Sequence, residues 1–278
     1  MDYFNFYSNL PNLPFMGIIS LFFLVLMRLV PIMVLAPFLG AKLAPGIARM
    51  GFAIALTFIF LPFIAVNVKV PLNFDTAFIL FAFKEILVGL VIGFIVTIPF
   101  YMVQTSGTIV DYLRGASIMQ AQDPTLQSQT SPIGILYNYI LIAIFFQING
   151  PYIFFDALMK SYELIPPTEY INPLFLSIKS GFWKIIFDII NQIVTIAIQL
   201  SAPALVAILM AEMFLGIANR LAPQVQIAFL GMSIKSLLGL GLLWVAWFFI
   251  LKQFTKHAYS WFEVLDKIIY SMRALVQS

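Results

Sequence analysis

Cysteine is absent from this 278-residue sequence, and histidine occurs only once, at His257. The lack of cysteine excludes disulfides, iron–sulfur ligation and thiol nucleophiles, and one histidine leaves no histidine-based metal site. Charged residues are also scarce, at 10% of the chain, whereas soluble domains carry about 25%. Such a chain cannot cover a globular surface with polar groups, so the composition excludes an ordinary soluble fold.

The sequence signatures of common enzymes and of nucleic-acid binding are missing as well. The chain has no HExxH, no GxSxG and no GxxxxGK[ST], the motifs of metalloproteases, serine hydrolases and phosphate-binding loops. Its lysines and arginines are scattered and form no basic run, which argues against nucleic acid. We therefore expect no enzyme, no cofactor and no metal.

Apolar residues dominate what is present, at 62% of the chain with 29 phenylalanines. Lipid removes the need for a polar surface, and a spanning helix needs about 20 mainly apolar residues. The candidate segments are Leu13–Phe38, Gly46–Val66, Ala77–Met102, Ile133–Phe155, Gly181–Leu215 and Val225–Leu251. The sequence predicts an all-α, polytopic membrane protein with about six hydrophobic segments.

Two of these segments are irregular. Ile133–Phe155 is interrupted near Asn149 and Pro151, and Gly181–Leu215 is longer than one bilayer needs and contains Pro203. Six spans would also place the basic loop after Phe38 and the basic tail on opposite sides, against the positive-inside rule. Irregular backbone is tolerated at membrane depth only where protein or water covers it, which favours a protein-embedded assembly.

The C-terminal residues 252–278 return to soluble character. Phe254, Ala258, Trp261 and Leu265 recur at intervals of three and four, which predicts an amphipathic helix. We expect its apolar face to lie on the membrane surface or on a partner.

Ionisable residues inside apolar segments are costly and mark function or protein contacts. Those singled out are Arg28, Glu85, Asp188, Glu212 and Lys235. Each could line a conduit, or form a structural ion pair between packed helices. Both interpretations remain open from the sequence.

Three spacings add to this. Asp188, Gln192, Thr195 and Gln199 share one stripe of a helix, which predicts a pore lining or a polar seam between subunits rather than a lipid-facing surface. Gly89 and Gly93 have the GxxxG spacing of close helix contacts. Asp111 and Arg114, three apart, could pair on a helix or belong to a solvated turn.

Several motifs occur in one order along nearly the whole chain. They are Arg28 with APFLG at Ala36–Gly40, KEILVGLVIG from Lys84, GTIVDYLRGAS from Gly107 with Asp111, Arg114 and Gly115, Asp123-Pro124, Asn149-Gly150 followed by Ser161-Tyr162 and Pro166, Ala202-Pro203, EMFLGIANRLAPQ with Glu212, Gly216, Arg220 and Pro223, and Ile234–Ser236 with Lys235. Together they resemble the FliR/SctT family of the type III secretion export apparatus. Arg114-Gly115, Glu212 and Lys235-Ser236 resemble the injectisome branch, SctT, more than the flagellar branch.

The resemblance implies helical hairpins and a share in the export gate of the bacterial inner membrane. The implied partners are the R and S subunits, the U switch subunit and unfolded substrates in transit, with lipid around the complex. It also implies an R-like part at 1–165 and an S-like part at 166–251, followed by the tail at 252–278.

We expect the polar stretch Gly107–Ser131, with Gln122, Gln127 and Ser131, to border the export path. It could instead be an ordinary loop outside the membrane. The competing function for the whole chain is a secondary transporter with a midplane substrate site. Transporters usually show repeated halves, and no clear repeat is present.

Overall fold

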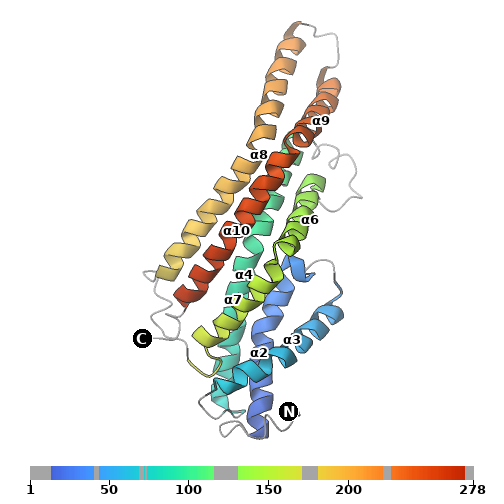
Figure 1. The fold of residues 1–278 in the computed structure, drawn as a ribbon. Helices are drawn as coiled ribbons and strands as arrows, with labels where there is room; N and C mark the ends of the chain where they lie inside the picture. The colour runs from blue at the N-terminus through green and yellow to red at the C-terminus, as the bar shows by residue number, and fades with distance from the viewer. Residues whose placement is uncertain are drawn as a thin grey trace. The chain divides into compact units, whose positions relative to one another are not determined.

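The computed structural model describes residues 14–40, 44–68, 72, 74–115, 131–170, 181–221 and 227–272. In this part of the chain every regular element is a helix (Figure 1). The helices are α2 (Phe15–Leu35), η1 (Pro37–Leu39), α3 (Gly46–Val66), α4 (Thr76–Leu113), α6 (Pro132–Gln147), α7 (Gly150–Leu164), α8 (Gly181–Leu221), α9 (Ile227–Val245) and α10 (Trp247–Met272). The all-α prediction is confirmed.

Four helices are long and apolar enough to cross a membrane: α2, α3, α4 and most of α8. The number rises to six if α6 with α7, and α9 with α10, each count as one bent span. This range agrees with the six segments expected. The interruption foreseen near Asn149 is real, because Asn149 has a left-handed backbone with φ of 58° between α6 and α7.

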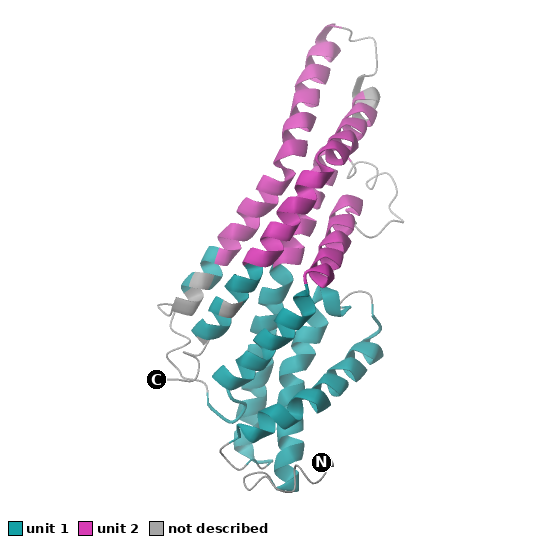
Figure 2. Cartoon of the chain, viewed as in Figure 1, with its two compact units in different colours: residues 1–98, 149–188, 261–278 teal, residues 99–148, 189–260 magenta. Residues whose placement is uncertain are grey.

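The chain divides into two compact units that are interleaved in the sequence (Figure 2). Unit 1 comprises residues 1–98, 149–188 and 261–278, and unit 2 comprises residues 99–148 and 189–260. The boundaries fall inside α4, α8 and α10 and at the break between α6 and α7. The division into R-like, S-like and tail parts stays a prediction.

Each unit has its own apolar core. In unit 1, Leu24 and Leu29 of α2 are fully buried, and the rings of Phe38 and Phe154 meet edge to face at 5.1 Å. In unit 2, the ring of Tyr137 meets that of Phe254 at 5.2 Å. Such ring pairs add about 0.5–1.5 kcal/mol beyond the area they bury.

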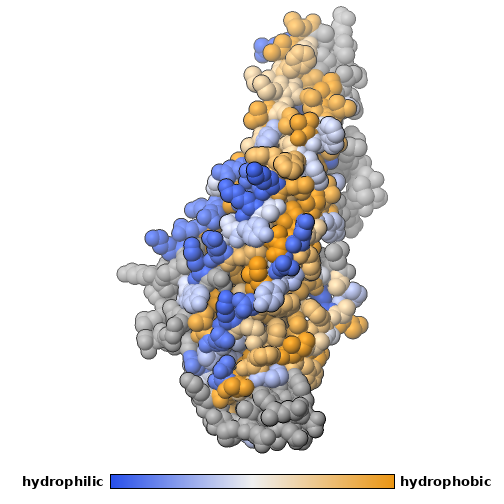
Figure 3. Space-filling model, viewed as in Figure 1, coloured by the Kyte–Doolittle hydropathy of each residue, from blue (hydrophilic) through white to orange (hydrophobic). Residues whose placement is uncertain are grey.

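Many large apolar side chains remain exposed, among them Phe63, Phe214 and Trp244. Hydrophobic residues cover much of the face seen in Figure 3. A soluble monomer rarely exposes contiguous apolar patches of this extent, so the surface suits lipid and neighbouring subunits.

Two sequence-based expectations need correction. The apolar stripe of α10 is buried within the chain, with Phe254 and Ile268 fully enclosed and Leu265 at 3% exposure, so it is not free for a membrane surface or a partner. Helix α4 also continues to Leu113, so the first residues of the supposed polar loop are helical. The Thr108 hydroxyl bonds to the Gln104 carbonyl of the same helix, so it is satisfied without a loop.

Candidate functional site

A buried ion pair joins α2 to α4 in unit 1. The guanidinium of Arg28 donates to the Glu85 carboxylate through Nε at 2.5 Å and NH2 at 2.8 Å. Both side chains are 0% exposed. Arg28 also lies over the Tyr162 ring, with 4.0 Å from Cζ to the ring centroid. The fork of two parallel bonds is the strong geometry for this pair, and of the two interpretations the ion pair is the one seen.

The same cluster holds the end of α7. Arg28 donates to the Ser161 hydroxyl at 3.2 Å and to the Ile165 carbonyl at 2.7 Å. Carbonyl groups at a helix C-terminus carry partial negative charge and have no partner within the helix. The guanidinium therefore gives a hydrogen-bond partner to the Ile165 carbonyl, which has none within α7.

Lys84 adds a second buried cation. Its ammonium lies 3.1 Å from the Glu85 carboxylate and donates to the carbonyls of Pro166 at 2.6 Å and Glu169 at 2.9 Å. The cluster thus holds two cations and one carboxylate, and backbone carbonyls stabilise the extra positive charge. Three segments far apart in sequence are fixed together by these contacts.

Gly89 and Gly93 lie where α4 crosses α2. A Cβ added at Gly89 would collide with the Arg28 carbonyl oxygen, and one at Gly93 would lie 3.0 Å from Leu35 Cδ1 and 3.2 Å from Ile32 Cα. The glycines therefore allow the two backbones to approach closely. Glu85 lies one helical turn before Gly89 on α4, so this close contact brings its carboxylate within reach of Arg28.

In unit 2, Asp111 connects α4 to the start of α6. One carboxylate oxygen accepts from Arg114 Nε at 2.7 Å. The other accepts from the Ser131 hydroxyl at 2.5 Å and from the Ile133 amide at 2.8 Å. Asp111 is 3% exposed, so this is a buried helix pair, not a solvated turn.

The N-terminus of α6 is stabilised by this arrangement. Ser131 accepts from the Gly134 amide at 2.9 Å, so two free amides of the first turn have oxygen partners. A carboxylate beside a helix N-terminus is also favoured by the helix dipole. Arg114 further donates to the Ser236 hydroxyl at 3.5 Å, which links the pair to α9.

Gly107 is a packing residue between α4 and α6. A Cβ added there would lie 2.6 Å from the Gly134 amide nitrogen, so α4 and α6 touch at paired glycines. One turn away, the Asn138 amide donates to Gln104 Oε1 at 2.9 Å. Beyond the end of α4, Gly115 has a φ of 87°, a left-handed conformation that favours glycine.

A further ion pair joins α8 to α9. Lys235 Nζ lies 2.5 Å from Glu212 Oε1, and their side chains are 23% and 42% exposed. Arg220, in the last turn of α8, is exposed. Glu212 therefore has a partner other than Arg220, as the helical spacing of the two residues leads one to expect.

The predicted polar stripe lies on one side of α8. Asp188, Gln192, Thr195 and Gln199 are all exposed, and the Thr195 hydroxyl bonds to the carbonyl of Asn191 at 2.9 Å. The stripe therefore remains open to water or to another chain. Whether it faces a pore or a seam stays a prediction.

The remaining predicted residues divide into two groups. Gly150 is buried at the start of α7, and Gly216 on α8 has open space around it. Gln122, Asp123, Pro124, Gln127 and Pro223 lie outside the described residues.

Sequence reasoning placed Lys84 and Ser161-Tyr162 in the family motifs but missed their buried partners. It also missed the Gly107–Gly134 crossing. The buried pairing of Lys84 could have been found, because it is an ionisable residue in an apolar segment beside Glu85. The bonds of Ser161 and Tyr162 and the glycine crossing have no local signal that names their partners, because small or hydroxyl-bearing residues are frequent in membrane helices.

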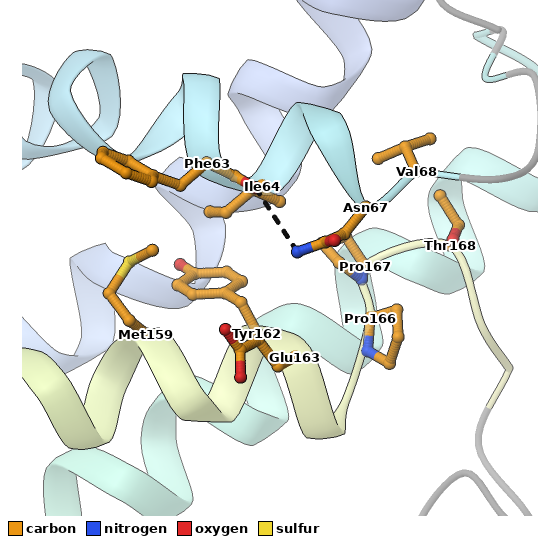
Figure 4. Close-up of a pocket in the computed structure, with 10 residues that line it drawn as sticks. All are labelled: Phe63, Ile64, Asn67, Val68, Met159, Tyr162, Glu163, Pro166, Pro167 and Thr168. Carbon is orange, nitrogen blue, oxygen red and sulfur yellow. Dashed lines mark hydrogen bonds between the residues drawn. The ribbon is translucent and has the colours of Figure 1, made fainter.

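The described residues also include a pocket in unit 1, of about 130 Å³, between the ends of α3 and α7 (Figure 4). Among these same residues no group of three His, Cys, Asp or Glu side chains could hold a metal ion.

The sequence pattern of the family described as "Bacterial export proteins, family 1" matches residues 19–260. Yop proteins translocation protein T of Yersinia pestis is 35% identical over 214 residues, which cover 77% of this chain and 80% of that protein. Secretion system apparatus protein SsaT of Salmonella typhimurium is 29% identical over 202 residues, covering 72% of this chain and 75% of that protein. Flagellar biosynthetic protein FliR of Bacillus subtilis is 29% identical over 214 residues, which cover 77% of this chain and 81% of that protein. These matches confirm the resemblance inferred from the motifs, and the chain belongs to family 1 of the bacterial export proteins, the FliR/SctT family.

Proposed function

We propose that this chain is a non-enzymatic subunit of the type III secretion export gate. In this role it contributes helices to a closed pore through which unfolded proteins leave the bacterial cytoplasm. Its partners are the R and S subunits and the U switch subunit, in the bacterial inner membrane. The higher identity to the Yersinia protein than to the Bacillus FliR, 35% against 29%, supports the injectisome branch.

The exposed polar stripe of α8 is the observation that carries this proposal. A carboxylate and two amides cost several kcal/mol in hydrocarbon, yet Asp188, Gln192 and Gln199 have no cover within the described chain. Helix α8 has 41 residues, or about 60 Å at 1.5 Å per residue. A bilayer core is about 30 Å thick, so neighbouring subunits or water must surround much of this helix.

The ion pairs support an assembly subunit rather than a reaction centre. The Arg28 and Asp111 clusters are satisfied by contacts within the chain. A channel for many unfolded sequences needs weak and unselective contacts, so that cargo can leave. Amide and hydroxyl side chains on α8, and Gln122 and Gln127 in the sequence, have this character.

Purification from membranes tests the assembly. We expect the tagged chain to co-purify in a fixed ratio with the R and S subunits through detergent extraction and gel filtration. A lone monomer that binds a small ligand would instead indicate a secondary transporter.

Crosslinking tests the path. The chain lacks cysteine, so single cysteines at Gln122, Gln127, Gln192 or Gln199 give a clean background. We expect at least one of them to capture an export substrate stalled by a folded fusion. A cysteine at Tyr152, which is 77% exposed on α7, is the control. Equal capture at Tyr152, or none at the four sites, would remove them from the path.

A further inference from the structure

The pocket between α3 and α7 has apolar walls. Phe63, Ile64 and Val68 line it from the end of α3 and the residues that follow, while Met159 and Pro167 line it from α7 and its continuation (Figure 4). All of its lining residues belong to unit 1. Walls of this kind suit a chain of methylene groups.

The polar atoms of the pocket are mainly hydrogen-bond acceptors. Glu163 supplies a carboxylate, Asn67 an amide oxygen and Thr168 a hydroxyl that can accept or donate. The Asn67 amide nitrogen already donates to the Phe63 carbonyl at 3.5 Å. Pro166 and Pro167 have no backbone N–H. The Tyr162 hydroxyl is also engaged, since it donates to the Val25 carbonyl at 3.1 Å. The pocket therefore favours a ligand that donates hydrogen bonds.

The carboxylate of Glu163 has no cationic partner among the described residues. Lys160, three residues earlier on α7, pairs with Asp156 at 2.7 Å. The nearby cations Arg28 and Lys84 are both paired with Glu85, and their side chains are 2% exposed or less. Near a membrane or a subunit contact, an unpaired carboxylate is costly and marks a partner of opposite charge.

We propose that this pocket receives a lysine or arginine side chain carried by an apolar helix of a partner subunit. The apolar walls hold its methylene stem, and Glu163 with Asn67 binds the charged head. Lysine and arginine commonly bury their stems along apolar surface in this way while the charged head stays in polar surroundings. A single carboxylate is too few ligands for a metal ion, which takes six or more oxygens in the case of Mg²⁺ or Ca²⁺. This inference rests on the proposed function, because it requires an assembly.

A photo-crosslinking residue in place of Met159, in the complete complex in native membranes, tests it. We expect one crosslinked peptide from another subunit, with a lysine or arginine inside an apolar segment. Glu163→Gln should lower the yield about fivefold, the effect of losing a partly exposed ion pair, and Glu163→Lys should abolish it. Asp156→Asn, which removes an exposed charge from the same helix, should leave it unchanged.

Lys69 is the alternative occupant within this chain, because it follows the lining residue Val68 in the sequence. If the crosslinked peptide contains Lys69, or if Lys69→Gln lowers occupancy as Glu163→Gln does, the proposal is wrong. It is equally wrong if the product is lipid or a second copy of this chain, or if Glu163→Gln changes nothing.

Co-purification with the R and S subunits is measured on the same samples. If the wild-type chain does not co-purify, the proposed function fails. If the complex is intact but the crosslink does not depend on Glu163, only the assignment of the pocket fails.

Discussion

The Arg28–Glu85 cluster allows a quantitative prediction about unfolding. Glu85→Gln keeps the size of the side chain but removes the charge that faces Arg28 at 2.5 Å and Lys84 at 3.1 Å. Two cations that are 2% exposed or less would then lie together without a counter-charge. Removing one partner of a buried pair costs about 3–5 kcal/mol, and we expect Glu85→Gln to lower the free energy of unfolding by that amount.

Thermal unfolding and pulse proteolysis of the detergent-purified protein measure this loss. The matched control is Asp156→Asn, which breaks a pair whose side chains are 40% and 52% exposed. Exposed pairs contribute about 0–1 kcal/mol, so the control should unfold nearly as the wild type does.

A double variant separates charge from packing. Arg28→Met with Glu85→Leu replaces the pair by apolar residues, and such replacements of buried pairs are often tolerated. We expect it to cost less than Glu85→Gln alone, because no guanidinium is left unpaired. If Glu85→Gln matched the Asp156→Asn control, or if the double variant were the least stable, the electrostatic reasoning would be wrong.

Three further predictions concern packing, capping and the α8–α9 pair. Leucine at both Gly89 and Gly93 should block assembly without reducing synthesis, because the added side chains collide with the α2 backbone; a normal yield of complex would contradict this. Asp111→Ala should destabilise the fold by about 1–3 kcal/mol, since it leaves buried donors unpaired, and protease sensitivity near the start of α6 measures it. Glu212→Lys or Lys235→Glu alone should weaken secretion, and the double exchange should restore part of it; no recovery would mean that the two side chains act separately.

The composition determined the class of this protein. With 10% charge and 62% apolar residues, the surface suits lipid, and apolar runs of about 20 residues make the spanning elements helices. The spacing of motifs determined the family, because order and distance along the chain survive where single residues vary. The interruption at Asn149 was also readable locally, since polar residues with Gly150 and Pro151 break a helix wherever they occur.

The partners of each charge were decided only by the tertiary structure. Arg28 and Glu85 are 57 residues apart, and Arg28 and Ile165 are 137 apart, so no local pattern joins them. Asp111 paired with Arg114 as its spacing allowed, but its bonds to Ser131 and Ile133 depend on how α6 returns to α4. Likewise, the spacing of apolar residues along α10 predicted an apolar face but not that the face would be buried within the chain. Periodicity records which side of a helix avoids water, whereas the identity of the neighbour follows from the packing of helices distant in sequence.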